Sequence, residues 1–187
     1  GGGIEAFDLL ALASALPRRG LTVIRHEQPW RVAGRKTVAL PERVDQGWRP
    51  ALDAVTTRYA GLPLWVGGRS AGARGACRNF DDRQAGVVCL SFPLHPPGRP
   101  DVSRIGELAG VSGPVLVVQG ESDPFGSPKD VRDAAMAAGG AQPLVIGVPG
   151  THSFSRRADV RDSIVTSVAD FLRGVIAERR RFRRRSE

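Results

Sequence analysis

Cysteine, histidine and long apolar runs are all scarce in this sequence, and each shortage excludes a class of protein. The two cysteines, Cys77 and Cys89, belong to no C-x-x-C or clustered His/Cys pattern. A disulfide scaffold and a metal site therefore lack support, and buried thiols in a cytoplasmic, reducing compartment are the simpler interpretation. No apolar stretch approaches the roughly 20 residues of a membrane-spanning helix. We expect no metal, no other cofactor and no membrane contact.

Acidic residues are also in short supply, since 19 Asp and Glu face 27 Lys and Arg, which gives a formal net charge of +8. Six arginines and one glutamate lie in residues 179–187, so about +5 of this charge belongs to the tail. We therefore expect one domain over residues 1–178 and a basic tail over residues 179–187. Nucleic-acid binding by the tail is an alternative that salt-sensitive binding would support.

The order of the apolar segments predicts an α/β fold. Short, nearly continuous apolar runs predict strands at residues 21–24, 62–66, 86–90, 114–119 and 143–148. Helical patterns occupy residues 4–16, 42–59 with an interruption around Gly47 and Pro50, 71–79, 105–109, 129–138 and 159–178. Apolar strands that alternate with helices are typical of a parallel sheet buried on both faces. We expect a doubly wound, mostly parallel sheet with helices on both faces and a minimal cap.

The sequence Gly68-Arg69-Ser70-Ala71-Gly72 is a G-x-S-x-G motif between a predicted strand and a predicted helix. At such a turn the serine adopts a strained backbone and its hydroxyl is exposed, while the residues two before and two after it must be small. The Ala71 N–H at the helix start is a candidate oxyanion donor. The alternative interpretation is a glycine-rich loop with an incidental serine.

Two further polar residues follow later strands at the edge where parallel strands end. Asp123 and His152 come after the strands at 114–119 and 143–148, and the order Ser, Asp, His is the one expected with a nucleophile elbow. His152 would act as general base, and Asp123 would orient its imidazole. Glu121 competes with Asp123 for that role. His26 competes with His152, but it precedes the elbow.

The remaining candidate site residues are expected near this edge. A second oxyanion donor is expected from the turn before the first helix, at Gly1 or Gly2. Trp30, Arg69 and His95 are candidates for the wall of a substrate pocket. For Trp30 a packed surface aromatic is the alternative, and His95 could instead hold its proline-rich loop in place.

Several stretches of this chain resemble small α/β-hydrolases related to the dienelactone hydrolases. The similarity covers nearly all of the chain except the arginine tail and is carried by residues 27–35, 67–74, 92–100, 118–126 and 149–154. The bacterial branch in question is similar to a testis-expressed mammalian protein and to a hydrolase-like domain of a chromatin acetyltransferase complex. The resemblance implies a serine nucleophile, where the dienelactone hydrolases proper carry cysteine, and a triad of Ser70, Asp123 and His152. It implies no particular substrate.

The resemblance also implies a strand and an H-G-x-G-type turn before the first helix. Only Gly1, Gly2 and Gly3 stand where that turn would be. We therefore expect the 187 residues to be a fragment, poorly soluble or inactive alone, whose missing strand would lie between the strands at 21–24 and 62–66.

The sequence as a whole predicts a serine hydrolase that acts on a small acyl ester or thioester. The predicted loops are too short for a large lid, so an open and shallow pocket is expected. The alternative function is a catalytically idle hydrolase fold that serves as a scaffold for protein interactions, because one branch of the similar proteins belongs to a chromatin complex.

Overall fold

The computed structural model describes residues 3–35, 41–140 and 142–186, which are built around a parallel β-sheet. Its strands lie side by side in chain order: β1 (Trp65–Arg69), β2 (Gly86–Leu90), β3 (Val115–Gly120) and β4 (Leu144–Val148). Because all of them run in the same direction, the loops that follow them meet at one edge of the sheet. The predicted α/β fold with a mostly parallel sheet is confirmed.

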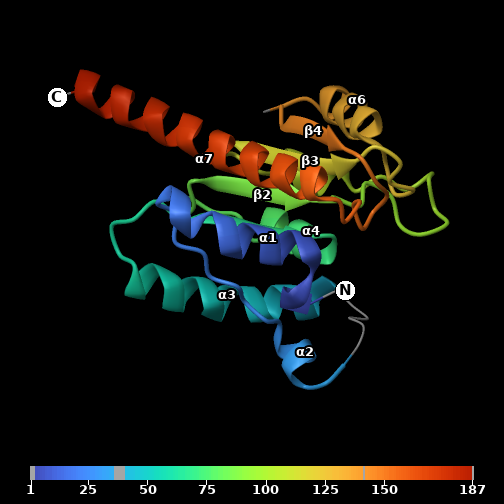
Figure 1. Cartoon of the computed structure of the whole chain (residues 1–187), viewed down its shortest axis with the longest axis horizontal. Helices are drawn as coiled ribbons and strands as arrows, with labels where there is room; N and C mark the ends of the chain where they lie inside the picture. The colour runs from blue at the N-terminus through green and yellow to red at the C-terminus, as the bar shows by residue number, and fades with distance from the viewer. Residues whose placement is uncertain (1–2, 36–40, 141, 187) are drawn as a thin grey trace.

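Helices cover both faces of the sheet (Figure 1). One face carries α1 (Phe7–Ala15) and α7 (Ala158–Ser186), which lie side by side. The other side holds α3 (Pro41–Arg58), α4 (Ala71–Arg78), α5 (Ile105–Ala109) and α6 (Pro128–Ala138). Shorter helical turns are η1 (Gly3–Glu5), η2 (Pro17–Arg19) and α2 (Pro29–Val32). None of the described helices is both long and apolar enough to cross a membrane.

Alternate residues of each strand supply two separate hydrophobic cores. In β2, Val88 and Leu90 join the core beneath α1 and α7, whereas Val87 and Cys89 join the core shared with α4. This division follows from the period of two in a strand, where successive side chains point to opposite faces. Every residue of β2 and β3 is buried, as expected for central strands of a two-sided sheet.

The prediction of a strand at residues 21–24 is wrong. These residues have no regular structure, although Leu21 and Val23 pack against the core beneath α1 and α7. An open pocket of about 220 Å³ is lined by Thr22 and Ile24 of this segment and by residues 62–64, which precede β1. Among the described residues β1 pairs only with β2. Without a neighbouring strand within hydrogen-bonding reach, an apolar run packs on the core without forming a ladder.

Two predicted helix boundaries also need correction. The helix α3 continues through Gly47 and Pro50, where an interruption was expected. Trp48 and Leu52 are buried in the core shared with α4, so tertiary packing outweighs the cost of an internal proline. Gly47 is needed because a Cβ there would lie 2.6 Å from Pro29 of α2. The closing helix α7 runs on to Ser186, past the predicted end at residue 178.

The start of α6 is fixed by a capping box. The Ser127 Oγ accepts a hydrogen bond from the Asp130 N–H at 3.2 Å, and the Ser127 N–H donates to the Asp130 carboxylate at 2.8 Å. Hydrogen bonds from Ser127 lower the pKa of Asp130 below its usual value. The contribution of the Asp130 carboxylate to stability is therefore present above its unfolded pKa and is lost as pH falls through its folded pKa.

We predict that Ser127→Ala lowers the free energy of unfolding by about 1 kcal/mol at neutral pH, because one N-terminal N–H of α6 loses its acceptor. The loss should shrink when unfolding is measured in denaturant below pH 4, where Asp130 becomes protonated. Ser163→Ala is the matched control, because Ser163 is exposed within α7 and caps no helix. An equal effect of the two substitutions would contradict the role of the box.

Candidate active site

Ser70 occupies a sharp turn between β1 and α4. Its backbone has φ 54° and ψ −113°, in a region that residues other than glycine rarely adopt. The turn is held by β2, because the Ser70 N–H donates to the Leu90 carbonyl oxygen at 3.0 Å. Strain of this kind costs about 1–3 kcal/mol and persists only where neighbouring structure enforces it. Ser70 therefore has the backbone of a nucleophile elbow.

The two motif glycines that flank Ser70 differ in what they allow. A Cβ on Gly68 would lie 2.4 Å from the Gly72 carbonyl carbon and 2.9 Å from the Ala73 nitrogen, so β1 and α4 touch at that point. A Cβ on Gly72 would meet nothing within 4 Å. The expectation that both positions must be small is therefore correct for Gly68 and wrong for Gly72.

The structure brings Ser70, Asp123 and His152 into one chain of hydrogen bonds. The Ser70 hydroxyl lies 2.8 Å from His152 Nε2, and His152 Nδ1 lies 2.8 Å from Asp123 Oδ2. The His152 side chain is 18% exposed, whereas the Asp123 side chain is fully buried. With Nδ1–H donating to the carboxylate, Nε2 is left as the acceptor for the serine proton. This arrangement can activate a hydroxyl as a nucleophile.

Asp123 is held in place by more than His152. Its Oδ2 also accepts a hydrogen bond from Gln119 Nε2 at 3.0 Å, and its Oδ1 accepts one from the Phe125 N–H at 2.9 Å. Gln119 Nε2 additionally lies 2.7 Å from the Gly126 carbonyl oxygen, which secures the turn that carries Asp123. Sequence reasoning missed Gln119. Its signal was a polar residue in an otherwise apolar strand, next to the edge where the site forms.

Close backbone contacts bring the loop of His152 to the turn of Asp123. A Cβ on Gly120, the last residue of β3, would lie 2.3 Å from the Thr151 carbonyl oxygen. The ring of Phe125 packs edge-on against the imidazole of His152, with centroids 4.7 Å apart and planes at 85°. The absence of a side chain at Gly120 thus lets the two loops approach until the imidazole reaches Asp123.

The donors expected for an oxyanion are only partly within the described residues. Ala71 is the first residue of α4, so its N–H has no acceptor within the helix and lies at the positive end of the helix dipole. Gly1 and Gly2 lie outside the described residues.

The competing acid and the competing histidine lie elsewhere. Glu121 is exposed, and its backbone N–H donates to the Val148 carbonyl oxygen of β4 at 2.9 Å. His26 lies in the irregular segment after η2, where burial lowers its pKa and a contact with the Gly47 backbone raises it. Within residues 3–35, 41–140 and 142–186, no three side chains of His, Cys, Asp or Glu gather to hold a metal ion.

The three candidates for a pocket wall make different contacts. Trp30 lies on α2, with the Arg31 guanidinium 5.7 Å from its ring centroid. His95 holds the loop after β2 in place: its N–H donates to the Phe125 carbonyl oxygen, and its Nδ1 lies 3.0 Å from that of Val102. Arg69 donates to the His152 carbonyl oxygen at 2.9 Å.

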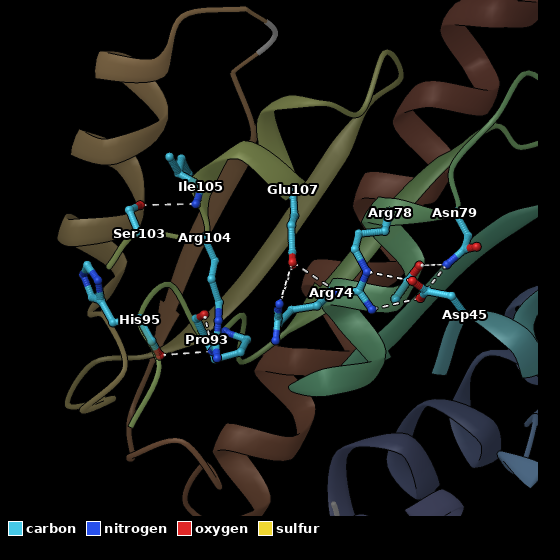
Figure 2. Close-up of polar contacts among 11 residues, drawn as sticks. Asp45, Arg74, Arg78, Asn79, Pro93, His95, Ser103, Arg104, Ile105 and Glu107 are labelled. Carbon is cyan, nitrogen blue, oxygen red and sulfur yellow. Dashed lines mark hydrogen bonds and ion pairs between the residues drawn. The ribbon is translucent and has the colours of Figure 1, made fainter. Parts of the chain in front are cut away.

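Charged side chains also join the helices on this side of the sheet (Figure 2). Arg74 of α4 donates to Glu107 of α5 at 2.8 Å, and Arg78 donates to Asp45 of α3 at 2.8 Å. Arg104, at the start of α5, donates to the His95 carbonyl oxygen at 3.2 Å and so holds the loop after β2. Figure 2 shows these contacts as two groups: one joins α3, α4 and α5, and the other joins the residue before α5 to the loop after β2.

Comparison with known proteins agrees with this architecture. A family model described as alpha/beta hydrolase domain matches residues 1–177. The chain belongs to this family. It is thus a small α/β-hydrolase, as the resemblance in its sequence implied.

Solved structures with the same fold include several described as hydrolases. An alpha-beta serine hydrolase homologue from Coxiella burnetii is 19% identical, with a TM-score of 0.71 over 88% of this chain and 77% of its own. An α/β serine hydrolase without lid from Xanthomonas campestris is 23% identical, with a TM-score of 0.70 over 90% of this chain and 75% of its own. Est1E from Butyrivibrio proteoclasticus is 13% identical, with a TM-score of 0.72 over 94% of this chain and 84% of its own. At these identities the likeness concerns the fold.

We predict opposite outcomes for alanine at the two elbow glycines. Gly68→Ala should lower the thermal midpoint strongly, because its Cβ would collide with backbone atoms that cannot rotate away. Gly72→Ala should leave the midpoint unchanged or raise it, because alanine in a helix is favoured over glycine by roughly 0.5–1 kcal/mol. Thermal unfolding followed by circular dichroism measures both. Equal destabilisation by the two would show that the elbow is built differently.

Proposed function

We propose that this protein is a serine hydrolase that cleaves a small acyl ester or thioester, with Ser70 as nucleophile, His152 as general base and Asp123 as the acid that orients the imidazole. The proposal rests on one observation, the unbroken hydrogen-bonded chain Ser70–His152–Asp123 with both contacts at 2.8 Å. The strained backbone of Ser70 and the α/β-hydrolase family of the chain support it.

In the acylation step, Ser70 Oγ attacks the carbonyl carbon while its proton passes to His152 Nε2. The negative charge that develops on the carbonyl oxygen is stabilised by the Ala71 N–H, with Gly1 or Gly2 proposed as the second donor. The C–O or C–S bond then breaks, and the imidazolium returns its proton to the leaving group. Asp123 stays ionised throughout and stabilises the imidazolium.

In the second step, water hydrolyses the acyl-enzyme by the same route. His152 Nε2 removes a proton from the attacking water, and the collapse of the second tetrahedral intermediate returns a proton to Ser70 Oγ. No metal or organic cofactor takes part in this proposal. We place the reaction in the cytoplasm, where the free thiols of Cys77 and Cys89, buried with their sulfur atoms 3.6 Å apart, would remain reduced.

We predict that, in a full-length version of the protein, Ser70→Ala lowers kcat/KM for nitrophenyl esters by about three orders of magnitude or more, because the nucleophile is removed. A series of esters with increasing acyl length, measured with the unmodified protein, defines the preferred substrate size. Circular dichroism should show an unchanged fold. Retention of most activity by the variant would disprove the role of Ser70, and background rates in the unmodified protein would favour a catalytically idle scaffold.

We predict that Asp123→Asn lowers kcat by about 10³–10⁴-fold and leaves KM nearly unchanged, because the amide favours the wrong imidazole tautomer. Glu121→Gln is the matched control, since Glu121 is exposed and lies two positions earlier in the same turn. It should retain the activity of the unmodified protein. The reverse result, with the loss in Glu121→Gln, would assign the acid to Glu121.

A further inference from the structure

Arg69 connects three segments that meet at the catalytic edge. It is the last residue of β1 and directly precedes Ser70, and its side chain is only 15% exposed. One guanidinium nitrogen donates to the carbonyl oxygen of His152 at 2.9 Å. The Nε lies 3.0 Å from the Asp8 carboxylate on α1. The side chain of Arg69 thus connects the end of β1, next to Ser70, with the backbone of His152 and with α1.

The partner of Arg69 on α1 is a carboxylate with almost no access to solvent. The Asp8 side chain is 2% exposed, and its Oδ1 accepts a hydrogen bond from the Leu9 N–H at 2.9 Å. Burial raises the pKa of Asp8, and the charge of Arg69 opposes that rise. Because a buried carboxylate requires a cation, Asp8 restricts where the guanidinium can lie. The ion pair with Asp8 therefore holds the guanidinium where another of its nitrogens reaches the His152 carbonyl oxygen.

His152 has two contacts through its ring and, through Arg69, a third through its backbone. The ring contacts to Ser70 and Asp123 fix the imidazole once the loop is in place, but neither holds the main chain of the loop. The hydrogen bond from Arg69 holds the main chain of the loop at His152 itself. A displacement of about 1 Å in a catalytic group can cost 10²-fold in rate. The position of this carbonyl group therefore bears on the geometry of the base.

We propose that Arg69 is a positioning residue, held by Asp8, that keeps the backbone of His152 at the distance the base needs. This inference rests on the proposed hydrolase function, and it gives Arg69 a role other than that of a pocket wall. Lysine cannot replace it fully, because one ammonium group does not offer the rigid fork that serves Asp8 and the His152 carbonyl oxygen together.

The first test compares Arg69→Ala with Arg74→Ala in the hydrolysis of a nitrophenyl ester. Arg74 is a close match, because it is 17% exposed and ion-paired with Glu107, yet its side chain contacts α5 and not the His152 loop. Arg69→Ala should lower kcat by about 10- to 100-fold with little change in KM, since the base is displaced while the substrate still binds. Arg74→Ala should retain kcat. Equal kcat values in Arg69→Ala and the unmodified protein would overturn the proposal.

Two further variants separate positioning from a general loss of structure. The double variant Asp8→Asn/Arg69→Ala leaves no buried charge unpaired, so it should fold even if Arg69→Ala does not, and its kcat should be equally low. Added guanidinium ion, at about 50 mM and far below denaturing concentrations, should restore part of kcat in the Arg69→Ala background and none in Arg74→Ala. The kcat of Arg69→Lys should fall between those of Arg69→Ala and the unmodified protein. Failure of guanidinium to raise kcat in both Arg69→Ala backgrounds would contradict a positioning role.

Amide hydrogen exchange tests, without relying on catalysis, whether the hydrogen bond from Arg69 holds the His152 loop in place. The loop contains backbone bonds from Phe154 N–H to the Thr151 carbonyl oxygen at 2.9 Å and from Ser155 N–H to that of Pro149 at 3.1 Å. These amides should exchange faster in the double variant than in the unmodified protein, and Arg74→Ala should leave them unchanged. Unchanged exchange rates would refute the claim that Arg69 holds the loop. If the unmodified protein hydrolyses no ester, the proposed function fails, while the exchange result still decides whether Arg69 holds the loop.

Discussion

The candidate site depends on the hydrogen bond between the buried Asp123 carboxylate and His152. A carboxylate without solvent contact must be satisfied by protein donors, and here they are the His152 imidazole, the Gln119 amide and the Phe125 N–H. The bond forms because Gly120 has no side chain to keep the two loops apart. The position of the group that accepts the Ser70 proton therefore depends on the close approach of the loops that carry Ser70, Asp123 and His152.

The parallel sheet explains why three distant segments of the chain reach the same place. Ser70, Asp123 and His152 follow β1, β3 and β4, whose carboxyl ends lie at one edge in register. Two buried cores, one on each face, fix the strands. The loops can then adopt strained or tightly packed backbones, as at Ser70, because the strands beneath them are packed between these cores.

Four of the five predicted strands are present, and the fold class was predicted correctly. The apolar runs of these strands mark them, most clearly in β2 and β3, where every residue is buried. The prediction from sequence was wrong about residues 21–24, where the same composition packs on a core but has no strand to pair with. It grouped Ser70, Asp123 and His152 through motif order. It missed Gln119 and Asp8, since the roles of these residues arise from contacts between distant elements, and a lone polar residue in an apolar segment does not identify its partner.

The central claim is that Ser70 is a nucleophile activated by His152. The most direct measurement is the intact mass of the unmodified protein after incubation with a fluorophosphonate, followed by peptide mapping of the adduct. The account predicts one adduct per chain, on the peptide that contains Ser70, because an activated serine attacks phosphorus as it attacks an acyl carbon. A protein that remains unlabelled at a concentration that saturates other serine hydrolases, or that carries its adduct on another residue, would contradict it.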